Sequence, residues 1–203
     1  MSTPLRPAVF LDRDGTINEQ MGYINHISRF QLLPGVGAAV ARLNAAGVPV
    51  VAVTNQSGLA RGYFPESLLV EVHEKMRREL AAAGAHLDGL YVCPHHPEGV
   101  TEQFRLRCDC RKPKDGLFRR AAAELGLDLA RSYVVGDRWS DLKAAAACGA
   151  KGILVLTGYG RGDLAYIGPS QKIQPHFVAQ DLTAAVAWIL ADLGFGSASI
   201  GGA

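Results

Sequence analysis

The chain has 203 residues, of which 48% are hydrophobic, and a formal net charge of +2 at pH 7. This length suits one domain with a sizeable core. The near-neutral charge and the lack of a basic block argue against a nucleic-acid partner. No apolar stretch approaches the roughly 18 residues of a membrane span, and none precedes residue 8, so we expect a cytoplasmic protein with no membrane partner.

Apolar runs and helical periodicity alternate along the chain. Strands are predicted over 8–12, 48–54, 88–93, 132–136 and 150–156. Helices are predicted over 35–46, 65–83, 116–125, 139–147 and 181–192. This alternation indicates an α/β fold with a Rossmann-like, doubly wound parallel sheet and helices on both faces.

Two long stretches, 94–115 and 157–176, show neither period and are predicted to be irregular. Loops of that length inside a domain are usually functional or mobile. We expect a single domain over 1–193. Residues 194–203 are rich in glycine, serine and alanine and are predicted to be a disordered tail.

Two carboxylates directly follow the first predicted strand. Asp12 and Asp14 are one residue apart, and Gly15 then favours a turn. Both side chains are therefore expected at the carboxyl end of a strand, where open α/β sheets bind ligands. Close carboxylates repel, so a cation or a proton is expected between them, and an aspartate in this place can attack phosphorus. The alternative is an acidic turn without catalytic function.

Polar residues also follow two later strands and precede the third helix. Thr54 and Asn55 end the second strand, Lys112 stands before the helix, and Asp137 ends the fourth strand, with Asp141 four residues on. The alternatives are structural, since Thr54, Asn55 and Asp137 could cap helices and Asp141 suits a first helical turn. An aspartate nucleophile, a hydroxyl, a lysine and a distal aspartate in this order resemble the haloacid dehalogenase superfamily of phosphatases.

The first irregular stretch is bracketed by cysteine and histidine residues. A Cys-x-His pair, twelve residues and a Cys-x-Cys pair follow one another, and the expected metal ligands are Cys93, His95, Cys108 and Cys110. Three thiolates and one imidazole suit a structural, tetrahedral Zn²⁺ with no open position. The alternatives are a disulfide, which a cytosolic setting disfavours, and free thiols. His96 is a competing ligand.

The zinc pattern narrows the resemblance to the histidinol-phosphatase-like subgroup with a zinc loop. The motifs are Phe-Leu-Asp-Arg-Asp-Gly-Thr-Ile-Asn, Thr-Asn-Gln-Ser-Gly, Cys-Pro-His-His-Pro and Cys-Asp-Cys-Arg-Lys-Pro, within about residues 8–157. Within the subgroup the chain resembles the bacterial heptose bisphosphate phosphatase family, because the histidinol-phosphate phosphatases have a much shorter segment between their ligand pairs. The resemblance implies a core without a large cap domain and a loop, 93–110, stapled by zinc.

The resemblance also implies a mechanism. Asp12 attacks the phosphoryl group, Asp14 acts as general acid and then as general base, and Thr54 and Lys112 bind the phosphoryl oxygens. Catalytic Mg²⁺ is held by Asp12, the backbone carbonyl of Asp14, and Asp137. Asp141 is expected to order Lys112 or the magnesium waters. The implied substrate-binding residues are Arg13, Gln20, Met21, Gly22, Tyr23, Asn55, Gln56, Ser57, Arg111 and Arg138.

The implied partner is a small phosphosugar, and a monomer is expected. The implied reaction removes the C7 phosphate of D-glycero-D-manno-heptose 1,7-bisphosphate through an aspartyl-phosphate, in ADP- or GDP-heptose biosynthesis. The alternatives are histidinol phosphate or another small phosphosugar as substrate, and phosphotransfer to a sugar acceptor. An inactive phosphosugar-binding protein is disfavoured, because every catalytic position is filled.

Overall fold

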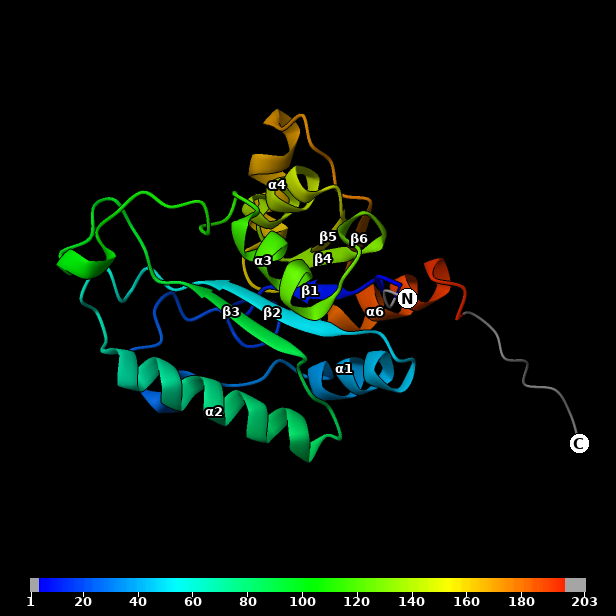
Figure 1. Ribbon diagram of the computed structural model, residues 1–203, viewed down its shortest axis with the longest axis horizontal. Coiled ribbons are helices and arrows are strands. Elements are labelled where there is room, and N and C mark those ends of the chain that lie inside the picture. The colour runs from blue at the N-terminus through cyan, green and yellow to red at the C-terminus, as the bar shows by residue number, and fades with distance from the viewer. Residues whose placement is uncertain (1–3, 196–203) are drawn as a thin grey trace, which may run out of the picture.

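A parallel sheet runs through the centre of the computed structural model, which describes residues 4–195 (Figure 1). Its strands are β1 (Val9–Leu11), β2 (Val50–Asn55), β3 (Gly89–Cys93), β4 (Tyr133–Gly136), β5 (Lys151–Val155) and β6 (Phe177–Ala179). Their order is β3-β2-β1-β4-β5-β6, and every adjacent pair is parallel. The five predicted strands are confirmed to within two residues. β6 was not predicted, because three residues are too few to show a period.

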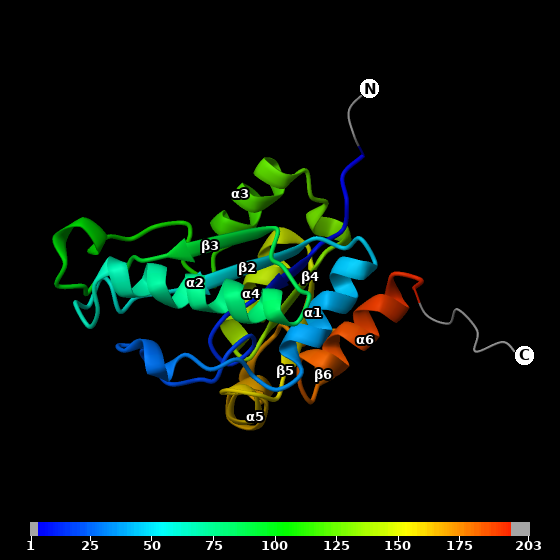
Figure 2. The same ribbon diagram turned by 90° about the horizontal axis from the view of Figure 1, so that it is seen from below.

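Helices cover both faces of the sheet, as predicted (Figure 2). They are α1 (Val36–Ala45), α2 (Glu66–Ala82), α3 (Gly116–Leu125), α4 (Trp139–Cys148) and α6 (Leu182–Asp192). Each predicted helix is confirmed to within one residue. The prediction that 157–176 is irregular is wrong in part. This stretch contains three short helical turns: α5 (Gly160–Gly162), a π-helical turn over Asp163–Ile167 and a 3-10 turn over Gly168–Ser170.

Side-chain alternation along the strands builds two cores. On one face, Val9 and Leu11 of β1 pack towards α1, α2 and α6. Between them, Phe10 points to the other face, where it packs edge-to-face on Phe118 of α3. Because successive strand residues point to opposite faces, a run that is apolar throughout is expected for a strand covered on both sides.

The topology places the functional residues. From β1 the chain moves through β2 and β3 towards one edge of the sheet, and from β4 through β5 and β6 towards the other. The switch point therefore lies between β1 and β4, which is where open α/β sheets bind ligands. Asp12 follows β1 and Asp137 follows β4, so both carboxylates reach this point.

The remaining segments are loops and termini. In the described residues, 94–115 forms a long excursion between β3 and α3 that contains only the short 3-10 turn Glu102–Phe104. The backbone N–H groups of Gly194 and Phe195 donate to α6; the rest of the predicted disordered tail lies outside the described residues. No helix within residues 4–195 is long and apolar enough to cross a bilayer.

Candidate active site

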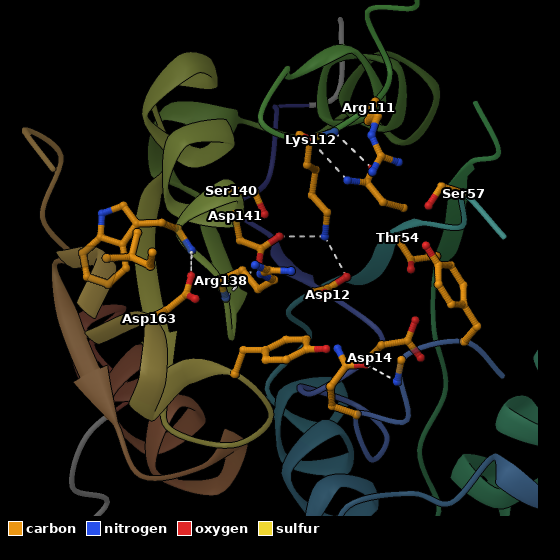
Figure 3. A pocket seen from close by; sticks show the side chains of 17 residues that line it. Asp12, Asp14, Thr54, Ser57, Arg111, Lys112, Arg138, Ser140, Asp141 and Asp163 are labelled. Carbon is orange, nitrogen blue, oxygen red and sulfur yellow. Dashed lines mark hydrogen bonds and ion pairs between the residues drawn. The ribbon is translucent and has the colours of Figure 1, made fainter. Parts of the chain in front are cut away.

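A cavity of about 460 Å³ opens at the switch point between β1 and β4 (Figure 3). The predicted residues that line it are Asp12, Asp14, Gln20, Gly22, Tyr23, Thr54, Asn55, Ser57, Arg111, Lys112 and Arg138. Four other predicted site residues are not part of this lining: Arg13, Met21, Gln56 and Asp137. The lining residues that the sequence did not single out as site residues are Trp139, Ser140, Tyr159, Asp163 and Ile167.

Lys112 lies at the base of the cavity between two carboxylates. Its Nζ is 2.7 Å from Asp12 Oδ1 and 2.7 Å from Asp141 Oδ1, and it donates to the carbonyl oxygen of Val53 at 2.8 Å. The residue is only 5% exposed. Burial alone would lower the pKa of Lys112, but Asp12 and Asp141 outweigh burial and raise it, so the ammonium stays charged. The expected contact between Asp141 and Lys112 is present.

Asp12 lines the cavity, and its side chain is 13% exposed. Burial raises its pKa to about 6, and the attraction of Lys112 offsets that effect only in part. Lys112 contacts Oδ1 of Asp12, which leaves Oδ2 as the atom available to attack an electrophile. The arrangement therefore leaves one oxygen of Asp12 in the state that a nucleophile would need.

Asp137 forms no salt bridge within residues 4–195. Its Oδ2 accepts the backbone N–H of Tyr159 at 2.8 Å, whereas its buried Oδ1 has no partner in that part of the chain. Burial, followed by repulsion from Asp12 and Asp141, raises the pKa of Asp137 to about 8. The carboxylates of Asp12, Asp137 and Asp141 each offer an oxygen within 4.8 Å of the others. This arrangement of oxygen ligands, with one buried atom unsatisfied, fits a hard divalent cation.

The capping alternatives for these residues are wrong. α2 begins at Glu66, eleven residues after Asn55, so neither Thr54 nor Asn55 caps a helix. Asn55 instead exchanges two hydrogen bonds of 3.1 Å with the backbone of Lys112 and so holds that residue at the end of β2. Asp137 does not cap α4 either, because the first N–H of that helix, on Trp139, donates to Asp163.

The carboxylate of Asp14 accepts several hydrogen bonds from neighbouring side chains. Arg13 Nη2 donates to both carboxylate oxygens of Asp14 at 2.8 Å, Asn18 Nδ2 donates at 3.0 Å, and Gln56 Nε2 donates at 2.8 Å. Burial would raise the pKa of Asp14, but the charge of Arg13 and these hydrogen bonds lower it. Arg13 and Gln56, predicted to bind substrate, therefore lie against Asp14. Asn18, which was not predicted, joins them.

Residues that follow β4 and residues that follow β5 together form one wall of the cavity. The guanidinium of Arg138 lies 4.7 Å from the ring centre of Tyr159, and both residues line the cavity. Trp139 fixes this wall, because its N–H donates to Asp163 at 2.8 Å and its Nε1–H donates to the carbonyl oxygen of Ile173 at 2.9 Å. Trp139 is 2% exposed and belongs to a buried apolar cluster with Leu142 and Leu154. The residues that form this wall show no regular periodicity in the sequence, so the sequence did not predict it.

The predicted zinc ligands lie together at the base of the long loop. Cys93 Sγ is 3.6 Å from Cys108 Sγ and 3.2 Å from Cys110 Sγ, and His95 Nδ1 is 3.2 Å from Cys110 Sγ. One atom from each of the four residues lies within 4.8 Å of the others, close to the edge of about 3.8 Å that Zn–S bonds of 2.3 Å give a tetrahedron. The cysteines form no disulfide in the described residues, and His96 contacts Arg61 instead. The cluster could hold a metal.

The four candidate zinc ligands are linked to the cavity, because two cavity-lining residues directly follow the last ligand in the chain. Arg111 follows Cys110 directly and its Nη1 donates to the carbonyl oxygen of His95 at 3.4 Å, and Lys112 is the next residue. A metal that fixes Cys110 would therefore also fix two cations of the cavity lining. This coupling is what a structural metal supplies to a neighbouring site.

We predict about one zinc per chain in protein purified without chelator, the number that one four-ligand site holds. Cys110→Ser should lower Tm by roughly 5 °C or more and raise KM at the same time, because Arg111 and Lys112 lose their anchor. Cys148→Ser is the matched control, since Cys148 lies outside the cluster. Zinc-free protein with titratable free thiols at Cys93, Cys108 and Cys110 would contradict the prediction.

Comparisons with known proteins agree with this geometry. The HAD-hydrolase-like family model matches residues 109–185. The chain is 50% identical over 154 residues, 75% of its length and 80% of the relative's, to the D-glycero-beta-D-manno-heptose-1,7-bisphosphate 7-phosphatase of Escherichia coli O6:H1. The enzyme of the same name from Haemophilus ducreyi is 50% identical over 155 residues, 75% of this chain and 85% of its own.

Solved structures extend the match to the fold. The D,D-heptose 1,7-bisphosphate phosphatase of Bordetella bronchiseptica, described as complexed with magnesium and phosphate, has a TM-score of 0.81 and 38% identity and covers 92% of this chain and 99% of its own. A putative HAD-like phosphatase from Mesorhizobium loti has a TM-score of 0.79 and 34% identity, with 98% and 91% covered. The chain is therefore a phosphoric monoester hydrolase of the haloacid dehalogenase superfamily and belongs to the D-glycero-D-manno-heptose 1,7-bisphosphate 7-phosphatase family.

Proposed function

We propose that the chain removes the C7 phosphate of D-glycero-D-manno-heptose 1,7-bisphosphate through an aspartyl-phosphate on Asp12. The observation that carries the proposal is the distribution of charge in one cavity. Asp12 and Lys112 offer a reaction centre at the base, and Arg111 and Arg138 line the same cavity beyond it. A substrate with two phosphates fits this arrangement, because one phosphate can meet Asp12 while the second meets a guanidinium.

The first step forms a bond between Asp12 Oδ2 and phosphorus and breaks the bond from phosphorus to the sugar oxygen. Asp14 gives its proton to that oxygen, so that the sugar leaves as an alcohol. Lys112 and the hydroxyl of Thr54 stabilise the charge that spreads over the phosphoryl oxygens in the transition state. A phosphate dianion in the cavity raises the pKa of Asp14 by repulsion, which counteracts the lowering by Arg13.

The second step returns the enzyme to its starting state. Asp14, now a carboxylate, takes a proton from a water molecule as that water attacks phosphorus. The bond from phosphorus to Asp12 breaks, and phosphate is released. One residue can serve in both steps because the acid step leaves it in the form that the base step needs.

The residues that would hold Mg²⁺ are Asp12, Asp137 and the backbone carbonyl of Asp14. The unpartnered buried Oδ1 of Asp137 supports this assignment. The ion would reduce the repulsion between Asp12 and the phosphate. Gly15 allows Asp137 to approach, because its φ is +87° and a Cβ there would overlap the Asp137 carboxylate.

We predict that heptose 1,7-bisphosphate is preferred over histidinol phosphate and that this preference depends on Arg111. Arg111→Ala should lower kcat/KM for the bisphosphate by about 10-fold to 100-fold, the range expected for a charge-assisted phosphate contact. The effect on 4-nitrophenyl phosphate should stay near twofold, because that substrate has no second phosphate. Histidinol is a cation, so Arg111 should also disfavour it.

Arg107→Ala is the control, because Arg107 is exposed on the same loop and does not line the cavity. A preference for histidinol phosphate, or equal losses with both phosphate esters, would overturn the substrate assignment. Transfer of phosphate to an added sugar acceptor in place of water would show a phosphotransferase.

A further inference from the structure

Behind Asp14, away from the cavity, a buried arginine contacts a buried histidine. Arg13 is 1% exposed and His73 is 7% exposed. The Nε and Nη2 atoms of Arg13 face the Asp14 carboxylate, and its Nη1 lies 3.2 Å from His73 Nε2. His73 belongs to α2, sixty residues further along the chain. A helix on one face of the sheet thus reaches the loop that carries the nucleophile.

The chemistry of the contact fixes which atom donates. Arginine has no acceptor atom, so Nη1 donates and the imidazole accepts through Nε2. The imidazole must then be neutral with its proton on Nδ1. Burial, together with the charges of Arg13 and Arg77, lowers the pKa of His73 to about 3, which agrees with a neutral ring.

The contact restrains the guanidinium at a second point. Two of its nitrogens hold Asp14, and Nη1 has no hydrogen-bond partner besides His73 among residues 4–195. A planar group held on two sides cannot turn about its own axis. Without the imidazole, Arg13 would be free to tilt, and the carboxylate that it holds would tilt with it. Catalytic groups must stay within roughly 0.5 Å of their productive positions.

Packing alone does not account for a histidine at this position. His73 lies on the buried side of α2 among Leu69, Val72, Met76 and Leu80, where an aliphatic side chain would pack equally well and would not bring a polar ring out of water. Among residues 4–195, the imidazole is the only neighbour of Arg13 on this side that accepts a hydrogen bond.

We infer that His73 is a positioning residue for Asp14: through Arg13 it holds the carboxylate where it can give its proton to the leaving sugar oxygen. The inference rests on the proposed function in one respect, the role of Asp14 as general acid. It adds a residue to the reaction that lies outside the cavity and never touches substrate.

The test compares two leaving groups, because kcat/KM reports the steps up to the first irreversible one, here phosphoryl transfer to Asp12. A sugar alcohol is a poor leaving group and needs the proton of Asp14, whereas 4-nitrophenolate leaves without one. His73→Leu should therefore lower kcat/KM for heptose 1,7-bisphosphate by about 10-fold to 100-fold and change kcat/KM for 4-nitrophenyl phosphate by less than about twofold. His73→Gln, whose amide oxygen can accept from Arg13, should recover most of the loss.

Val72→Ala is the control for stability, because Val72 is buried next to His73 in the sequence of α2 and has no polar contact. It should lower Tm and leave the ratio of the two kcat/KM values unchanged. If His73→Leu does not fold, His73→Ser removes the same contact with a smaller side chain and should shift the ratio likewise. Equal losses with both esters, or no loss with either, would overturn the inference.

Different results would contradict the proposed substrate and the proposed role of His73. If the wild-type enzyme ignores heptose 1,7-bisphosphate but hydrolyses glycerol 3-phosphate, the proposed substrate is wrong, and glycerol 3-phosphate replaces it as the poor leaving group in the same comparison. If the wild-type enzyme hydrolyses neither ester nor 4-nitrophenyl phosphate, both proposals are wrong.

Discussion

Asp12→Asn should reduce kcat by at least about a thousandfold, in line with the loss of a covalent nucleophile. An amide has nearly the shape of the carboxylate, and its oxygen can still accept from Lys112, but it does not attack phosphorus. The measurement is phosphate release from heptose 1,7-bisphosphate and from 4-nitrophenyl phosphate. Asp128→Asn, at a half-buried carboxylate that pairs with Arg131 and does not line the cavity, is the control and should retain full activity.

The same variant should be at least as stable as the wild type in magnesium-free buffer. The carboxylates of Asp12, Asp137 and Asp141 lie within 4.8 Å of one another, and Lys112 pairs with Asp12 and Asp141 but not with Asp137, so removing a negative charge relieves repulsion. The pKa of Asp12 is raised from 3.8 to about 6 on folding, so its ionisation destabilises the fold above pH 6 and has no effect below 3.8, where both states are protonated. The gain in Tm should accordingly appear at pH 7 and vanish towards pH 4. Substantial turnover, or a large loss of Tm at pH 7, would remove Asp12 from this role.

The sequence predicted where the carboxylates that follow β1 and β4 lie, because strand topology determines their positions. Asp12 and Asp137 each follow an apolar run, and parallel strands bring their carboxyl ends to one edge. No such rule links Lys112 to Asp12 across one hundred residues. The contact between Lys112 and Asp12 was predicted only from the family resemblance. The long loop before Lys112 shows no helical or strand periodicity, and its path depends on the four residues that could bind zinc.

The contact between His73 and Arg13 and the residues of one cavity wall were not predicted, and the reason is physical. Apolar periodicity tells which side of a helix is buried, and His73 lies on that side, but burial does not reveal which polar group it meets. The substrate contact of Arg13 was predicted from the family resemblance. Its side chain is instead buried, which a guanidinium tolerates only where acceptors surround it, as Asp14 and His73 do here. The wall that contains Tyr159 and Asp163 is built from short turns that leave no pattern in the sequence.

Lys112→Met should damage both activity and stability. The loss in kcat/KM should be about a hundredfold to a thousandfold, the usual effect of removing one donor that stabilises transition-state charge. Removing one partner of a buried ion pair typically costs about 3–5 kcal/mol, because Asp12 and Asp141 then remain buried without a cation. A large fall in Tm at pH 7 is therefore expected, and Lys114→Met, at an exposed lysine of the same loop, should not reproduce it.

The pH dependence of the fall in Tm of Lys112→Met shows whether the variant is destabilised by the loss of the positive charge or by the loss of packing. Without Lys112, the folded-state pKa of Asp12 must rise further above 3.8, because burial and repulsion from Asp141 remain while the only attraction is gone. The destabilisation is then largest above the raised pKa and disappears as the pH falls below 3.8, where the carboxyl is protonated in both states. Thermal unfolding between pH 4 and pH 8 in magnesium-free buffer should show the Tm of Lys112→Met approaching that of wild type at the acidic end. Adding Asp141→Asn to Lys112→Met should restore part of the Tm at pH 7 but none of the activity. A deficit in Tm that is the same at every pH would mean that Lys112 fills space and does not neutralise the carboxylates.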